Sequence, residues 1–408
     1  MASRTSSAIS LTKTIIGAGL LSMPLAFSTD GIVVGVIIIF VAALTSGYGL
    51  FLQAYVSRYT APGHATFFAL SSLTYKSLSV VFDLAIAIQC FGCAISYLVL
   101  VGDIMPTILG SPFWSPKVFW IMASTLVCVP LSFLRNLDSL KYSSILGLAA
   151  IAYMSLLVIF HFFLGDAYVP GERHLAPQSA WGVFSTFSII VFAFTGHQNM
   201  FSIINEASDR SLHGLTSLVA SAILASSGLF VAVGLAGYLT FGDSVSGNII
   251  LSYSHSWSAT FGKLCIVFMV LFSFPLMLHP ARISVNNIYQ WLVRREEEAE
   301  IDDETPLLES QSRSPPIEKT FVPLTVILLV VGYILAVSVK SFALVLAVVG
   351  ATGSTAISFI LPGLFGYKLI GSESDNPTRY ETWLRALSAL LVVWGVAVMV
   401  VCLYVSLS

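Results

Sequence analysis

Long apolar runs separated by short polar stretches follow one another along the whole 408-residue chain. Most runs are close to the roughly 20 residues that an α-helix needs to cross a bilayer. We therefore expect an all-α polytopic membrane protein. The pattern predicts eleven membrane spans, at residues 6–27, 31–56, 78–105, 118–134, 140–164, 179–205, 215–241, 258–292, 321–339, 342–364 and 383–406.

The first predicted span is interrupted by residues that an ordinary membrane helix avoids. Gly17, Gly19 and Pro24 lie close together inside it. Glycine loosens the backbone and proline removes a donor. At membrane depth, the freed backbone groups must be satisfied by protein or by a water-filled cavity. The interruption therefore indicates either a cavity near the middle of the bilayer or a kinked helix packed through its small residues.

The sixth span carries a similar interruption at Thr195-Gly196-His197-Gln198-Asn199. Breaks five spans apart predict two five-helix halves of opposite orientation, with a binding site where the breaks meet. The N-termini of half-helices attract a carboxylate, and their C-termini attract an ammonium group. An α-amino acid has both groups.

The predicted divisions are a first repeat (1–164), an extracytosolic loop (165–178), a second repeat (179–364), and a cytosolic loop with the eleventh helix (365–408).

The composition agrees with a membrane protein. It is 56% hydrophobic and 10% charged, whereas soluble domains are roughly 25% charged. The net charge of −2 and the lack of a basic cluster argue against nucleic-acid binding. All five cysteines fall in apolar runs, so we expect neither a disulfide framework nor a metal site. No nucleophile–base pair or phosphate loop is present, so we expect no enzymatic activity and no cofactor.

The basic residues predict the orientation. With the N-terminus in the cytosol, nearly all Lys and Arg residues fall at the cytosolic ends of the spans, as the positive-inside rule requires. The odd number of spans then places the C-terminus on the opposite face. The exceptions on that face are Lys117, Arg173, Lys263 and Lys340.

The longest polar interruption, residues 294–319, is rich in acidic residues and contains three prolines. It cannot bury enough apolar surface to fold, so we expect a disordered cytosolic loop. Within it, Asp303, Leu307 and Leu308 belong to a stretch resembling the acidic dileucine signals that adaptor proteins read to sort cargo to lysosomes and vacuoles. The alternative is a solvated acidic linker.

Five stretches, in order along nearly the whole chain, resemble the amino acid/auxin permease family of the amino acid–polyamine–organocation superfamily. The resemblance is closest to the fungal vacuolar amino acid transporters and to the animal sodium-coupled neutral amino acid transporter branch. The stretches are Lys13–Gly19 with Pro24, Phe91–Leu98 with Gly102 and Asp103, Thr195–Asn199 with Asn205 and Glu206, Ser273–Arg282, and Gly350–Thr355 with Leu361–Gly363.

The resemblance implies a LeuT-like fold, that is, a 5+5 inverted repeat plus an eleventh helix, with helices 1 and 6 broken. It also implies alternating access to a substrate site at the breaks and on the third helix. Tyr97 on that helix is equally compatible with a packing role. The implied substrate-binding residues are Ile16, Gly17, Ala18, Gly19, Leu20, Tyr97, Thr195, Gly196, His197 and Gln198.

One position bears on the coupling ion. Sodium-coupled members commonly carry Asn where this chain has Lys13. An ammonium group there would repel Na⁺, which favours H⁺ as the coupling ion. Alternatively, Lys13 extends to the lipid headgroups and serves only topology. Ser273 and Asp83 are further ion-coupling candidates; the alternatives are a serine bonded to the backbone and a structural carboxylate paired with a residue such as Arg282.

We therefore expect an integral membrane protein, surrounded by lipid, that moves neutral amino acids with protons across a vacuolar or lysosomal membrane. A sodium-coupled importer of the plasma membrane is one alternative. An amino-acid-sensing receptor with a transporter-like fold is the other.

Overall fold

The computed structural model describes residues 3–109, 116–134, 141–253, 256–300, 317–373 and 376–408. This part of the chain is helical and contains no β-strand. Before residue 165, the first span contains α1 (Arg4–Ile15), the 3₁₀ turn η1 (Ala18–Ser22) and α2 (Met23–Asp30). The other α-helices of this part are α3 (Ile32–Val56), α4 (Phe67–Thr74), α5 (Ser79–Leu109), α6 (Lys117–Ala123), α7 (Thr125–Ser132) and α8 (Lys141–Leu164).

The described residues of the second part of the chain are also helical. Its tenth predicted span is partly π-helical, over Gly350–Ser354 (η8) and Ala356–Ile360 (η9). The remaining α-helices are α9 (Ala180–Ala193), α10 (His197–Glu206), α11 (Leu212–Phe241), α12 (Trp257–Glu300), α13 (Ile317–Ser338), α14 (Phe342–Val349), α15 (Leu361–Leu369) and α16 (Arg379–Leu407).

The lengths and apolar character of these helices confirm a polytopic membrane protein. Within the described residues, 9 helices are long and apolar enough to cross a membrane, if α9 with α10 (Ala180–Glu206) and α14 through α15 (Phe342–Leu369) each count as one helix, or 10 if α1 and η1–α2 form one bent span. The two parts of that span are inclined at 47°. At the predicted fourth span, the structure has the shorter apolar segment Lys117–Ser132, which comprises α6 and α7.

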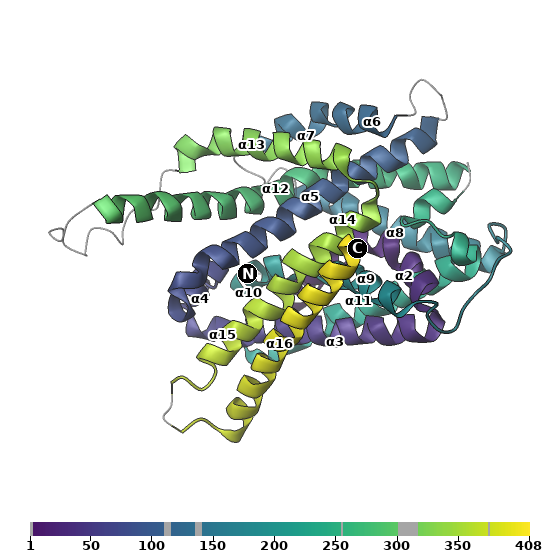
Figure 1. The fold of residues 1–408 in the computed structure, drawn as a ribbon. Coiled ribbons are helices and arrows are strands. Elements are labelled where there is room, and N and C mark those ends of the chain that lie inside the picture. The colour runs from purple at the N-terminus through teal and green to yellow at the C-terminus, as the bar shows by residue number, and fades with distance from the viewer. Residues whose placement is uncertain (1–2, 110–115, 135–140, 254–255, 301–316, 374–375) are drawn as a thin grey trace.

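The broken helices lie inside the bundle (Figure 1). α1 and α2 pack against α11, α2 and α9 pack against each other, and α10 packs against α3. The long helices α5 and α12 run beside each other, and α16 packs on α15 and α9. The second half of the first span is therefore surrounded by protein, as freed backbone groups require.

Glycines allow several of these helices to approach closely. A Cβ atom on Gly19 would lie 2.7 Å from Cβ of Ala193, where the first broken helix meets α9. A Cβ atom on Gly49 of α3 would overlap the carbonyl oxygen of Ser358. Small residues at such positions are typical of helix contacts in membranes.

Two helical segments differ from the predicted pattern. α4 lies between the second and third predicted spans, where no helix was predicted; it is too short to cross a bilayer. α12 continues to Glu300 and α13 begins at Ile317, so helix extends into both ends of the predicted loop 294–319. The Arg-Arg-Glu-Glu-Glu-Ala-Glu sequence favours helix through its intrinsic propensity. Asp303, Leu307 and Leu308 lie outside the described residues.

Candidate functional site

The first break lies between α1 and η1. The last turn of α1 is closed by the Ile16 N–H, which donates to the Thr12 carbonyl, and the Gly17 N–H donates to the Ile15 carbonyl. The 3₁₀ turn η1 then starts at Ala18 in a new direction. Because the first N–H groups of a helix have no partner within it, Ala18 and Gly19 present donors at the break. The two bonds at the end of α1 leave the carbonyls of Lys13 and Thr14 as acceptors on the other side of the break.

The second break separates α9 from α10. α9 ends at Ala193, and α10 starts at His197 with Gly196 as its N-cap. The Thr195 hydroxyl donates to the Val191 carbonyl 2.7 Å away, so it is bound to its own helix. The close contact of Gly19 with Ala193 joins the two breaks. The predicted meeting of the two interruptions is thus present in the structure.

A cavity of about 430 Å³ lies beside the first break. This volume falls within the range of small-molecule sites. Its lining comes from α1, η1, α5, α8, α9, α10 and α12, and from the residues at both breaks. The lining polar and titratable residues are Ser10, Lys13, Thr14, Gln89, Cys93, Tyr97, Thr195, Gln198, Asn199, Ser202, Glu206 and Ser273.

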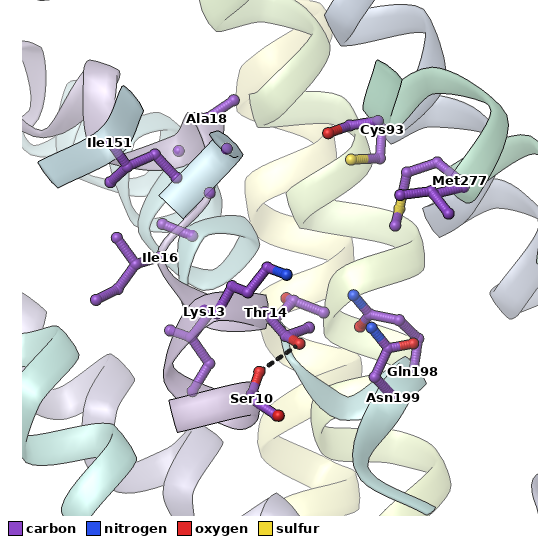
Figure 2. Close-up of a pocket in the computed structure, with 18 of the residues that line it drawn as sticks. Ser10, Lys13, Thr14, Ile16, Ala18, Cys93, Ile151, Gln198, Asn199 and Met277 are labelled. Atoms are coloured by element: carbon purple, nitrogen blue, oxygen red, sulfur yellow. Dashed lines mark hydrogen bonds between the residues drawn. The ribbon is translucent and has the colours of Figure 1, made fainter. Parts of the chain in front are cut away.

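Lys13 supplies the positive charge of the cavity. Figure 2 shows its side chain extending from α1 into the space between that helix and the side chains of Cys93, Met277 and Gln198. Among the described residues, no hydrogen bond or ion pair of the Lys13 ammonium is found. An ammonium group at membrane depth is costly unless a polar partner or water compensates it. The cavity therefore favours a ligand with a negative group or an acceptor.

The first turn of α10 contributes two amide side chains, Gln198 and Asn199. The Gln198 Oε1 atom is buried and has no hydrogen-bond partner within the described structure. On α5, by contrast, the Oε1 atom of Gln89 accepts a hydrogen bond from the Ser354 hydroxyl at 2.6 Å. Gln198 therefore offers a free acceptor to a ligand, whereas this oxygen of Gln89 is bound to the π-helical segment.

The cavity is exposed at one end and closed at the other. Ser10, Ser202 and Glu206 are exposed lining residues, at the start of α1 and along α10. Beyond the break, Met23 and Phe27 are fully buried. There, the Ser22 hydroxyl donates to the Gly247 carbonyl at 2.7 Å. A molecule in the cavity thus has access to the side on which α1 begins.

The structure brings most of the predicted site residues to this cavity. Those that line it are Lys13, Ile16, Gly17, Ala18, Gly19, Tyr97, Thr195, Gln198 and Ser273. Four others lie outside the lining: Leu20, Gly196, His197 and Asp83.

His197 is fully buried on the far side of the second break. Its Nε2 atom lies 3.1 Å from the Ser46 carbonyl oxygen, and its Nδ1 atom lies 3.0 Å from the Ser358 hydroxyl. The Gln53 amide donates to the His197 carbonyl at 3.2 Å. The imidazole therefore joins α10 to α3 and to the π-helical segment η9.

The other three residues are packed within the helical bundle. Leu20 is buried in the core. A Cβ atom on Gly196 would lie 2.9 Å from the Ile15 side chain, so this glycine faces α1. The Asp83 carboxylate accepts a hydrogen bond from the Asn287 amide at 3.1 Å. Arg282, considered above as a partner for Asp83, instead donates to the Ser132 carbonyl and the Thr325 hydroxyl.

Several lining residues were not on the predicted list, although helical spacing identifies them. On α1, Ser10 and Thr14 share a face with Lys13 and Gly17 because of the i, i+3, i+4, i+7 spacing. The same rule links Gln89 and Cys93 to Tyr97 on α5, and Ser202 and Glu206 to Gln198 on α10. Among the described residues, no group of three or more His, Cys, Asp or Glu side chains could hold a metal ion.

These features define a class of protein. A helical membrane protein with two broken helices and a polar cavity, reached from one side only, has the architecture of a transporter of small polar molecules.

The comparison with protein families gives the particular family. The family model described as transmembrane amino acid transporter protein matches residues 1–408. The chain belongs to this family, as the sequence motifs predicted, and the family consists of transporters rather than enzymes.

Relatives extend over almost the whole chain. It is 39% identical to vacuolar amino acid transporter 7 of Saccharomyces cerevisiae, over 98% of this chain and 97% of that protein. It is 40% identical to vacuolar amino acid transporter 5 of Schizosaccharomyces pombe, over 99% and 94% respectively. It is 26% identical to human sodium-coupled neutral amino acid transporter 7, over 93% and 82%.

Proposed function

We propose that this protein is a proton-coupled transporter that moves neutral amino acids across a vacuolar or lysosomal membrane by alternating access. The observation that carries the proposal is the Lys13 ammonium group, which lies in the cavity beside the first break without a partner among the described residues. The similarity to two vacuolar amino acid transporters at 39% and 40% identity supports the location and the substrate class.

The substrate fits the break through its two charges. The N–H groups of Ala18 and Gly19 and the Lys13 ammonium suit the carboxylate of an amino acid. Carbonyls at the end of α1 and the free Gln198 oxygen suit its ammonium group. The Glu206 carboxylate at the exposed end is the acidic residue of the lining. Apolar residues, such as Ile16, leave room for an uncharged side chain. This arrangement favours a zwitterion with a neutral side chain.

The positive charge of Lys13 favours H⁺ over Na⁺ as the coupling ion. A fixed ammonium group opposes a bound Na⁺ ion, because at about 4 Å two like charges repel by about 4 kcal/mol at an effective dielectric of 20. Ser273 lines the same cavity from α12, and we assign it to the coupling site with Lys13. The sodium-coupled relative, at 26% identity, represents the alternative.

The proposed topology has eleven spans, with α6 and α7 together forming the fourth. Residues 1–164 and 179–364 form two inverted five-helix repeats in a LeuT-like arrangement, and residues 365–408 add the last span. With the N-terminus cytosolic, the exposed end of the cavity faces the cytosol and residues 165–178 face the lumen. The C-terminus then lies in the lumen.

Sorting to the vacuolar or lysosomal membrane is assigned to Asp303, Leu307 and Leu308, which adaptor proteins would bind. Replacing both leucines by alanine should divert the protein to the cell surface. Unchanged organellar location would contradict this role.

Reconstituted vesicles test the transport mechanism. We expect an imposed pH gradient to drive uptake of labelled neutral amino acids equally with and without Na⁺. Lys13→Met should retain exchange of internal for external amino acid but lose accumulation driven by the pH gradient. Flux that requires Na⁺ and persists without a pH gradient would refute proton coupling.

A further inference from the structure

Asp30, the last residue of α2, is a carboxyl group buried inside the bundle. Its exposed fraction is 0%, and it lies at the end of the first broken span that is remote from the open end of the cavity. Its Oδ2 atom has no hydrogen-bond partner within the described structure. A buried carboxylate with an unpartnered oxygen is very unfavourable, whereas a neutral acid with an unpaired carbonyl oxygen is much less so.

The other oxygen of Asp30 is bonded to Thr186 on α9. The distance from Thr186 Oγ1 to Asp30 Oδ1 is 2.6 Å. The same hydroxyl lies 3.0 Å from the Val183 carbonyl and 3.2 Å from the Gly182 carbonyl of its own helix. A hydroxyl has one proton, and in helices it commonly donates to a carbonyl three or four residues earlier. If it does so here, the proton between Thr186 and Asp30 belongs to Asp30.

The surrounding backbone also disfavours a carboxylate. Asp30 lies at the C-terminus of α2, where the helix dipole is negative. The N-terminal N–H groups of α3 follow directly, but Ile32 donates to the His174 carbonyl and Val33 to the Leu175 carbonyl. The Gly31 N–H donates back to the Phe27 carbonyl. These three donors are therefore occupied by other oxygens.

Among the described residues, no cation compensates the group either. α2 packs against α3, α9, α11, η1 and η6 (Gly242–Ser244). α9 and η1 contain no titratable residue, and those of α3 are the tyrosines Tyr48 and Tyr55, well along the helix. His174 lies 3.1 Å from the Asp243 carboxylate and 3.5 Å from that of Glu172, and Arg173 donates to backbone carbonyls. The remaining titratable residues of these neighbours are Tyr238 and His213 on α11.

We propose that Asp30 is a proton-binding site that controls closure of the membrane face formed by residues 165–178. In this assignment Asp30 Oδ1 carries the proton and donates it to Thr186 Oγ1, Thr186 donates to the Val183 carbonyl, and Asp30 Oδ2 is an uncharged carbonyl oxygen. Docking of α2 on α9 therefore requires a protonated Asp30. When α2 leaves α9, the group meets water and releases its proton to the compartment on that face.

This assignment extends the proposed function, because an acidic compartment on that face would supply the proton that permits closure. It adds a proton site distinct from Lys13, on the opposite side of the break. Closure of this face would then be slow whenever the compartment is alkaline.

Transport by vesicles of uniform orientation tests the role. When the pH on the 165–178 face is raised, wild-type flux should fall by about tenfold per pH unit along the alkaline limb of the plot of flux against pH, as for a single titrating group. Asp30→Asn keeps a neutral donor for Thr186 and should remove that limb. Asp243→Asn changes an exposed acid on the same face and should keep the wild-type profile. An Asp30→Asn profile identical to that of the wild type would overturn the proposal.

Infrared spectroscopy tests the protonation itself, without any need for flux. The wild type should show the carbonyl band of a buried protonated carboxylic acid, and Asp30→Asn should lack it. Asp30→Glu, which keeps the acid, should retain a shifted band. A wild type without the band, or a band that persists in Asp30→Asn, would refute the assignment. Flux driven by Na⁺ alone would refute proton coupling yet leave this band in place, so the two failures can be distinguished.

Discussion

The two helix breaks meet in space but differ in their surroundings. At the first break, nothing lies within 4 Å of the position that a Gly17 Cβ atom would occupy, and the backbone borders the cavity. At the second, His197 is fully buried and hydrogen-bonded to two other segments. The first break is thus open to a ligand, whereas the far side of the second is part of the packed core.

This difference separates two uses of an interrupted helix. In the proposed mechanism, free backbone groups at the first break bind a substrate and release it again. At the second break, α10 is held to α3 and η9 through His197, so its first turn presents Gln198 and Asn199 at fixed positions. An interruption in a membrane helix therefore predicts backbone groups without partners inside the helix. The segments packed around the interruption decide whether those groups are open to a ligand or only support the site.

The largest expected effect comes from filling the first break. Gly17→Phe places a benzyl group in the open space beside the backbone, so amino acid flux should be abolished. The Gly17 backbone does not have positive φ, and nothing blocks a side chain there, so the protein should remain folded. Uptake by vesicles and thermal unfolding in detergent measure the two properties.

Gly228→Phe is the matched control, because Gly228 on α11 is exposed and also has nothing within 4 Å of its Cβ position. It should transport normally. Normal uptake by Gly17→Phe would show that the first break does not form the substrate site.

Removing the His197 imidazole, which holds α10 to α3 and η9, should mainly reduce stability. His197→Ala leaves the Ser358 hydroxyl without its imidazole partner and opens a cavity in the core, so we expect a loss of about 3 kcal/mol in the free energy of unfolding. Denaturation in detergent measures this loss. His213→Ala, an exposed histidine on α11, should change it by less than about 0.5 kcal/mol. If both variants were equally stable, the anchoring role would be wrong.

A smaller effect is expected at the contact between the breaks. A Cβ atom on Gly19 would lie 2.8 Å from the Ala193 Cα atom, whereas Gly17 has free space. Gly19→Ala should therefore cost about 2 kcal/mol through overpacking. Gly17→Ala should cost less than about 0.5 kcal/mol. Equal thermal unfolding midpoints for the two variants would contradict the close contact.

The helical fold and both breaks could be predicted because they depend on local sequence. Apolar runs of bilayer length specify spans, and Gly17, Gly19 and the Thr195–Asn199 stretch interrupt them. α4 was not predicted because its eight residues lack the length of a span. The π-helical segment after Gly350 was not predicted either, since it depends on packing against α5 and α9.

The placement of side chains was less accessible to sequence reasoning. His197 and Gln198 are adjacent polar residues, and both were predicted to bind substrate. Successive residues on a helix point in directions about 100° apart, so Gln198 reaches the cavity while His197 meets α3. That distinction requires knowing that Gly49 leaves room for the imidazole, which only the packed structure reveals. The burial of Asp30 could not be predicted, because a carboxyl group at the end of a span is usually solvated.

The smallest effect that separates the breaks concerns Gln198, one of the side chains that the second break adds to the cavity. Gln198→Ala removes the buried Oε1 atom that has no partner in the described structure. We expect the KM for the amino acid to rise about tenfold, or about 1.4 kcal/mol, since one hydrogen bond to a charged ammonium group is lost. Maximal flux should stay within about twofold, because the remaining site is unchanged. Gln178→Ala, which removes a glutamine near Asp243 outside the cavity, should leave the KM unchanged. Should Gln198→Ala also leave it unchanged, substrate recognition would rest on the first break alone.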